Sequence, residues 1–154
     1  MNDLLDKLCR QRRLDREEWR TLLANRHSLD RADLFARGEA ERRRWYGDQI
    51  YVRGLIECSN ICKNNCLYCG IRRDNRHVAR YRLDRDTILA CCEKGYGWGF
   101  RTFVLQGGED PGLTSDWVAE TVAAIKGRFP DCAVTLSLGE FDRQTYQLWF
   151  DAGA

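Results

Sequence analysis

The sequence has little net charge, no long hydrophobic run and no low-complexity tract. Its 25 lysines and arginines nearly balance its 23 aspartates and glutamates, giving a formal net charge of +2. Such a balanced chain shows no electrostatic preference for nucleic acid or for an anionic membrane. Nowhere do about 18 apolar residues follow one another, and the first residues lack the apolar centre of a signal peptide. We therefore expect a packed cytoplasmic protein with neither nucleic-acid nor membrane partners.

Cysteine, in contrast, is abundant. Eight cysteines in 154 residues would suggest disulfides in an exported protein, but no export signal precedes them here. Four of the eight lie between Cys58 and Cys69. Free cysteine in apolar surroundings behaves as a small hydrophobe. On that basis we expect the other four to be structural: Cys9, Cys91, Cys92 and Cys132.

Residues 1–48 are expected to form a helical leader. Three leucines near the start, Leu4, Leu5 and Leu8, share one helical face. Further along, Asp15 with Glu18 three residues later forms a capping-box pattern, and Asp30 is another N-cap candidate. Each of these signals predicts the start of a helix.

Residues 49–154 alternate between strand and helix patterns. Three β/α units in succession indicate a parallel sheet, because parallel neighbours require crossover connections. Three parallel strands leave an apolar edge unpaired, and natural folds cover such an edge or close it into a barrel. We therefore expect an α/β fold that corresponds to about three of the eight units of a β/α barrel, apparently truncated. The strands are predicted at 50–58, 101–106 and 132–140, with helices starting at Asp84, near Ser115 and near Asp142.

Three cysteines after the first strand form the spacing CxxxCxxC: Cys62, Cys66 and Cys69. Thiolates suit both iron-sulfur clusters and zinc. Structural zinc usually takes two separated pairs of ligands, and no second pair lies within ordinary reach, so the spacing favours a 4Fe-4S cluster. Three thiolates leave the fourth iron open to an external ligand. The alternative is a non-catalytic zinc module in which Cys58 is the fourth ligand.

Two further motifs follow the second and third strands. The glycines and carboxylate of Gly107, Gly108 and Glu109 lie directly after the second strand, and Ser137 and Glu140 lie at the end of the third. Ligands of β/α barrels bind at the carboxyl ends of the strands, where the cysteine loop also lies. We therefore interpret both motifs as part of a ligand site. Taken alone, they are equally consistent with an ordinary turn, core filling and a helix start.

The cysteine loop, with Tyr68 immediately before Cys69, resembles the CxxxCxΦC motif of the radical S-adenosylmethionine (SAM) superfamily. This resemblance implies a 4Fe-4S cluster on Cys62, Cys66 and Cys69 and SAM on the open iron. It leaves Cys58 as a buried thiol or a spare ligand. By the same resemblance Tyr68 belongs to the cofactor site, and the Gly107, Gly108 and Glu109 motif contacts the methionine amine of SAM. Ser137 and Glu140 are further candidates for SAM contacts.

Four segments together, NNCLYCGIRRDN, RYRL, VLQGGEDP and VTLSLGE, resemble the HydE family of FeFe-hydrogenase maturases, which is similar to biotin synthase and methylornithine synthase. The resemblance implies reductive cleavage of SAM to a 5′-deoxyadenosyl radical, a small-molecule or iron-complex substrate and partners in hydrogenase maturation. A methylornithine or biotin synthase-like enzyme is the alternative. Because later barrel units would hold most of the substrate pocket, we expect the isolated chain to turn over poorly.

Overall fold

The computed structural model describes residues 2–154, which divide after Ile50 into two compact units. The first unit is helical, and its small core consists of Leu5, Leu14 and Leu22. No helix in the described part of the chain combines the length and apolarity needed to cross a membrane. The first unit contains α1 (Asn2–Gln11), α2 (Arg16–Ala24), the short 3-10 helix η1 (Arg26–Ser28) and α3 (Arg31–Tyr46).

The predicted helix starts of the first unit are confirmed. The Asp15 carboxylate accepts from the Glu18 N–H at 2.8 Å, and the Glu18 carboxylate accepts from the Asp15 N–H at 2.9 Å, which completes the capping box. The Asp30 side chain similarly accepts from the Ala32 N–H at 2.9 Å at the start of α3. These caps satisfy backbone donors that have no partner within the helix.

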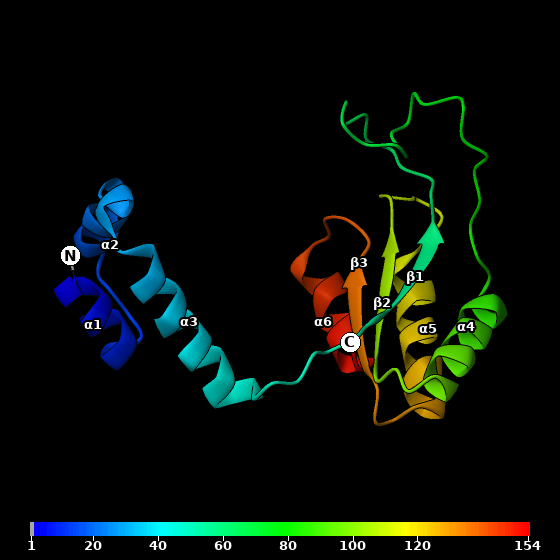
Figure 1. Ribbon diagram of the computed structural model, residues 1–154. Coiled ribbons are helices and arrows are strands. Elements are labelled where there is room, and N and C mark those ends of the chain that lie inside the picture. The colour runs from blue at the N-terminus through cyan, green and yellow to red at the C-terminus, as the bar shows by residue number, and fades with distance from the viewer. Residues whose placement is uncertain (1) are drawn as a thin grey trace. The chain divides into compact units, whose positions relative to one another are not determined.

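The second unit is a parallel sheet of three strands in the order β1-β2-β3, with a helix after each strand. The arrowheads of the three strands point to the same end of the sheet (Figure 1). The long loop that contains the cluster-motif cysteines leaves β1 at that end. The elements are β1 (Gly54–Ser59), α4 (Arg85–Gly97), β2 (Thr102–Gly107), α5 (Ser115–Arg128), β3 (Ala133–Ser137) and α6 (Arg143–Asp151).

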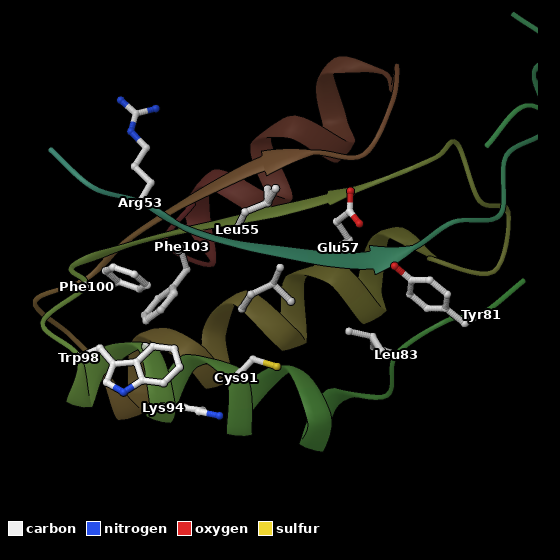
Figure 2. A pocket seen from close by; sticks show the side chains of 13 residues that line it. Arg53, Leu55, Glu57, Tyr81, Leu83, Cys91, Lys94, Trp98, Phe100 and Phe103 are labelled. Carbon is white, nitrogen blue, oxygen red and sulfur yellow. The ribbon is translucent and has the colours of Figure 1, made fainter. Parts of the chain in front are cut away.

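One face of the sheet packs on the helices and the other is open. Alternate strand residues enter the core, and Leu55, which points the other way in the middle of β1, is 56% exposed. In Figure 2, Leu55 and Glu57 lie on the side of β1 that faces away from α4. The core of the covered face includes Ile56, Phe103, Leu105 and Val134 from the strands and Ile88, Val122 and Ile125 from the helices.

Two predicted strand boundaries are wrong. The first strand begins at Gly54 rather than near Ile50, because only from Gly54 onward do its residues pair with β2. The third strand ends at Ser137 rather than near Glu140, because its pairing with β2 stops there. The helix α4 passes through Gly95 and ends at Gly97. A Cβ on Gly95 would lie 2.9 Å from the Phe103 ring, so glycine allows the helix to approach the sheet closely. That contact offsets the roughly 1 kcal/mol that an interior glycine costs a helix.

The expectation that four cysteines are buried structural thiols holds for only two of them. Cys92 and Cys132 are 0% and 1% exposed and belong to the main core. Cys9 and Cys91, in contrast, are exposed. Their apolar neighbours in the sequence do not surround them in space, because residues adjacent on a helix point to different sides.

Candidate functional site

The cysteine loop begins where β1 ends and returns to the core at α4. Its turns are held by backbone hydrogen bonds: the Cys69 N–H donates to the Cys66 carbonyl at 2.9 Å, and the Arg73 N–H donates to the Asn64 carbonyl at 2.8 Å. The cysteines therefore lie on a folded loop at the carboxyl end of the sheet, as the strand prediction required.

The Gly107–Gly108–Glu109 turn lies directly against this loop. A Cβ on Gly108 would come within 2.3 Å of the Ile61 carbonyl oxygen and 2.7 Å of the Cys62 Cβ. Only glycine therefore fits beneath the first cysteine of the motif. The Lys63 N–H donates to the Glu109 carbonyl at 3.0 Å, which joins the two segments further.

The Glu109 side chain is the point at which all three strand ends meet. Its carboxylate accepts from Asn64 Nδ2 at 2.7 Å and forms an ion pair with Lys63 Nζ at 3.0 Å. On the other side, a Cβ on Gly139 would lie 2.2 Å from the Glu109 Cγ, and Gly139 has a φ of +110°, which favours glycine. The turn after β3 thus makes room for the carboxylate, which the cysteine loop orients.

The remaining predicted cofactor residues are distributed around this point. Glu140 lines a pocket of about 430 Å³ together with Glu109 and Lys63. Ser137, exposed at the end of β3, pairs in register with Gln106 rather than lining that pocket. Tyr68 lies at the outer part of the loop and is 94% exposed. The structure therefore places Glu140 in the same pocket as Glu109, while Tyr68 projects into solvent.

The thiols of the motif are accessible but not arranged as a ligand set. Cys62 and Cys69 are half-buried and Cys66 is exposed. Within residues 2–154, no three side chains of His, Cys, Asp or Glu lie together in a way that could hold a metal ion. Two features therefore suit the loop to a cluster. It carries three accessible thiols, and it lies at the carboxyl end of the sheet.

Cys58 is separated from these thiols by its burial. It is 1% exposed and packs in the main core beside Ile56 and Leu105. Burial raises the pKa of the Cys58 thiol to about 11, which disfavours the thiolate that a metal requires. The structure thus places Cys58 in the core, as the buried thiol that the sequence suggested.

A buried ion pair that we did not predict connects the same segments below the rim. The Asp110 side chain is fully buried and accepts from Arg82 Nε at 2.8 Å, Arg82 Nη2 at 2.6 Å and Ser59 Oγ at 2.6 Å. Burial alone would raise the pKa of Asp110, but the hydrogen bonds from Arg82 and Ser59 outweigh it and lower the pKa to about 2. The acidic residue after the GGE motif was visible in the sequence, but its partners lie 28 and 51 residues away.

The sequence reasoning also missed a polar row on the open face of the sheet. Glu57 pairs in register with Gln106, and Gln106 pairs with Ser137. The three residues therefore cross β1, β2 and β3 at neighbouring positions, close to the carboxyl end of each strand. Their signal was a polar residue near the carboxyl end of each strand.

The comparison with known proteins identifies relatives of this chain. No protein-family model matches the sequence. The FeFe-hydrogenase maturase subunit HydE of Thermotoga maritima is 41% identical over 153 residues, which are 99% of this chain and 43% of that protein. A 3-methylornithine synthase of Methanosarcina acetivorans is 28% identical over 142 residues, covering 91% of this chain and 40% of that protein. The chain thus spans less than half the length of these relatives.

Solved structures show the same arrangement of elements. Methylornithine synthase PylB superposes with a TM-score of 0.74 at 27% identity and covers 98% of this chain and 45% of its own. The FeFe-hydrogenase maturase HydG superposes with a TM-score of 0.77 at 21% identity, covering 97% of this chain and 34% of its own, and shows the fold alone. With the cysteine motif and its strand-end position, these similarities show that the chain belongs to the radical SAM superfamily, as a relative of HydE.

Proposed function

We propose that this chain carries the cofactor site of a radical SAM enzyme that acts in FeFe-hydrogenase maturation, in the manner of HydE. The observation that carries the proposal is the meeting of the cysteine loop, the GGE turn and the turn after β3 at the Glu109 side chain. When bound, a 4Fe-4S cluster at such a site supplies the electron that cleaves SAM to methionine and a 5′-deoxyadenosyl radical. The chain's own residues bind and orient the two cofactors.

Three thiols would hold the cluster: Cys62, Cys66 and Cys69. Their accessibility suits them to this role, because iron can reach a thiol that is not enclosed in the core. Cys58, which is 1% exposed in the core, is not among the proposed ligands. A reducing compartment keeps such thiols free, so we also propose a cytoplasmic location.

Glu109 would bind the amino group of SAM. Its carboxylate already accepts an ammonium, the Lys63 Nζ at 3.0 Å, so its position suits a cation at this rim. Gly107 and Gly108 would let the backbone approach the same ligand closely. Glu140 faces the pocket beside Glu109 and would receive further polar groups of SAM, as would Ser137 from the polar row. Tyr68 would close over the cofactors from the exposed part of the loop.

The three-stranded sheet is proposed to be part of a complete β/α barrel. Both outer strands pair on one side only within residues 2–154, since β1 and β3 each pair with β2 alone. A hollow of about 660 Å³ runs along the free edge of β1, and its lining includes Trp98, Phe100 and Phe103 (Figure 2). Further β/α units would cover this apolar lining and surround the open face.

The substrate is proposed to be the small molecule or iron complex on which HydE acts, with hydrogenase maturation proteins as partners. Identity to HydE is 41%, against 28% to 3-methylornithine synthase, which favours the maturase over the amino-acid enzyme. A methylornithine synthase-like activity is the second candidate, because PylB has the same fold with a TM-score of 0.74.

Anaerobic reconstitution of the 154-residue chain with iron and sulfide tests the proposal. We expect about four irons and four sulfides per chain and, after reduction, an electron paramagnetic resonance spectrum that changes when SAM is added. An unchanged spectrum with SAM would refute the SAM site, and zinc without iron would refute the cluster. Product analysis with a chain extended to the length of the relatives then separates the two candidate activities.

A further inference from the structure

One arginine beyond the cysteine motif binds both ends of the cysteine loop. The guanidinium of Arg80 donates from Nη1 to the carbonyls of Asn60 and Ile71, the latter at 2.8 Å. Its Nη2 donates to the carbonyls of Arg72 at 2.6 Å and Asn75 at 3.0 Å. Four backbone carbonyls thus converge on a single half-buried side chain.

The carbonyls that Arg80 contacts lie on both sides of the cysteine motif. Asn60 precedes the first cysteine of the motif, and Ile71 follows the last one. Arg80 Nη1 therefore closes a ring of backbone that contains all three cysteines. The Asn60 side chain strengthens the closure, because its Nδ2 donates to the Ala79 carbonyl at 2.8 Å and its Oδ1 accepts from the Tyr81 N–H at 2.8 Å.

Only arginine can make this set of contacts. Its planar guanidinium presents several donors in a fixed fork, whereas a lysine ammonium presents three donors from one point. Holding the two ends of a flexible loop together costs conformational entropy, and the cysteines can gather around a cluster only if that cost is met. An arginine that bridges the two ends restricts the loop before the cluster binds, so less conformational entropy is lost on binding.

We propose that Arg80 is a positioning residue that closes the cysteine loop in the metal-free protein and thereby retains the cluster on Cys62, Cys66 and Cys69. The second half of this statement rests on the proposed function. The first half concerns the loop alone. Arg80 acts through backbone carbonyls.

Two substitutions distinguish the hydrogen-bond donors of the Arg80 side chain from its volume. Arg80→Met keeps a long side chain without donors, and Arg80→Lys keeps the charge and some of the donors. Arg76→Met is the matched control, because Arg76 lies on the same segment and is exposed. Far-UV circular dichroism with thermal melting establishes that each variant retains the helices and strands of the chain.

Hydrogen exchange of the metal-free proteins tests the closure of the loop. In Arg80→Met we expect exchange across residues 60–75 to be about tenfold faster than in the unsubstituted chain, as loss of a few net hydrogen bonds predicts. Arg80→Lys should restore part of the protection, and Arg76→Met should match the unsubstituted chain. Unchanged exchange in Arg80→Met would overturn the proposal. If Arg80→Met does not fold, the comparison of Arg80→Lys with Arg76→Met decides it in the same way.

Cluster retention is measured next, as the rate at which a chelator removes iron from the reconstituted proteins. We expect release from Arg80→Met to be about tenfold faster, with partial rescue by Arg80→Lys. The reduced cluster of Arg80→Met should also show a broadened paramagnetic resonance spectrum. Equal release rates with altered exchange would overturn the link to the cluster. Absence of a cluster from the unsubstituted chain would instead refute the proposed function, and hydrogen exchange would still decide the role of Arg80 in the loop.

Discussion

Cysteine occupies two contrasting regions of the second unit, the core beneath the sheet and the loop beyond its carboxyl edge. In the core, Cys58, Cys92 and Cys132 are at most 1% exposed, and burial raises the pKa of each thiol. In the loop, the motif thiols are half-buried or exposed. A residue type alone therefore does not identify a ligand. Burial separates the thiols of the core from those of the proposed ligand set.

The strongest test of this contrast is to remove one thiol from each region. Replacement of a loop cysteine, Cys62→Ser, should abolish cluster binding, because a cube held by two thiolates is not retained. The matched core replacement, Cys58→Ala, should leave the iron content unchanged. Iron and sulfide analysis after anaerobic reconstitution measures both. Loss of iron from a folded Cys58→Ala protein would show that Cys58 is a ligand after all.

Thiol reactivity should separate the same two regions without substitution. The pKa is raised to about 11 for Cys58 and about 12 for Cys92, so near pH 8 both should react with an alkylating reagent at least about 100-fold more slowly than a free thiol. The loop cysteines of the metal-free chain, together with exposed Cys9 and Cys91, should react rapidly. Peptide mapping after timed labelling identifies the sites, and labelling in denaturant is the control. Rapid labelling of Cys92 in the folded chain would contradict its place in the core.

The buried ion pair between Arg82 and Asp110 joins the end of the cysteine loop to the turn after β2, and it can be removed by one substitution. Asp110→Asn removes the charge that Arg82 and Ser59 contact, and we expect it to lower the free energy of unfolding of the second unit by about 2 to 3 kcal/mol. Denaturant titration measures the loss. Glu93→Gln, on the exposed side of α4, is the control and should change stability by less than about 0.5 kcal/mol.

The pH dependence of this loss follows from the lowered pKa of Asp110. Its folded value of about 2 lies below the ordinary 3.8, so the carboxylate contributes stability above about pH 4. That contribution disappears as the pH falls through about 2. The difference between the unsubstituted chain and Asp110→Asn should therefore be constant from pH 5 to 7 and shrink below about pH 4. A difference that persists undiminished at pH 2 would show that charge is not its cause.

The smallest expected effect concerns the ammonium that Glu109 already holds. Because Lys63 Nζ occupies the carboxylate that we assign to SAM, Lys63→Met should tighten SAM binding to the reconstituted chain about two- to fivefold at low salt. Lys94→Met is the control, since that ammonium lies over the Trp98 ring instead. Anaerobic calorimetry measures the dissociation constants. Weaker binding in Lys63→Met would indicate that Lys63 contacts SAM itself.

Predictions from the sequence succeeded where the signals are local. Asp15 and Asp30 start helices because a side chain a few residues away from a backbone donor can satisfy it regardless of the rest of the fold. Short runs of apolar and β-branched residues predicted all three strands of the sheet, and alternation supported the third. The start of β1 was wrong because no local signal shows where pairing with β2, a separate element, begins.

Among the residues of the candidate site, too, those in short motifs were predicted and those defined by long-range contacts were not. The cysteine spacing, the GGE turn and Glu140 were found from the sequence, because each is a short motif at the end of a predicted strand. Asp110 and its partner Arg82 were missed, since nothing in either segment indicates which charge of the other it contacts. The Lys63 contact with Glu109 was missed for the same reason.

The sequence by itself determined the helix caps, the parallel β/α order and the CxxxCxxC spacing, because these depend on residues close together in the chain. Only the tertiary structure decided which thiols are accessible, how Glu109 is held and how Arg80 closes the loop. The contacts that hold Glu109 and close the loop join residues far apart in the sequence, such as Asn64 with Glu109, 45 positions apart, and Arg80 with Asn60, 20 positions apart. Their geometry exists only when β1, β2 and β3 are side by side and bring their carboxyl ends to one edge.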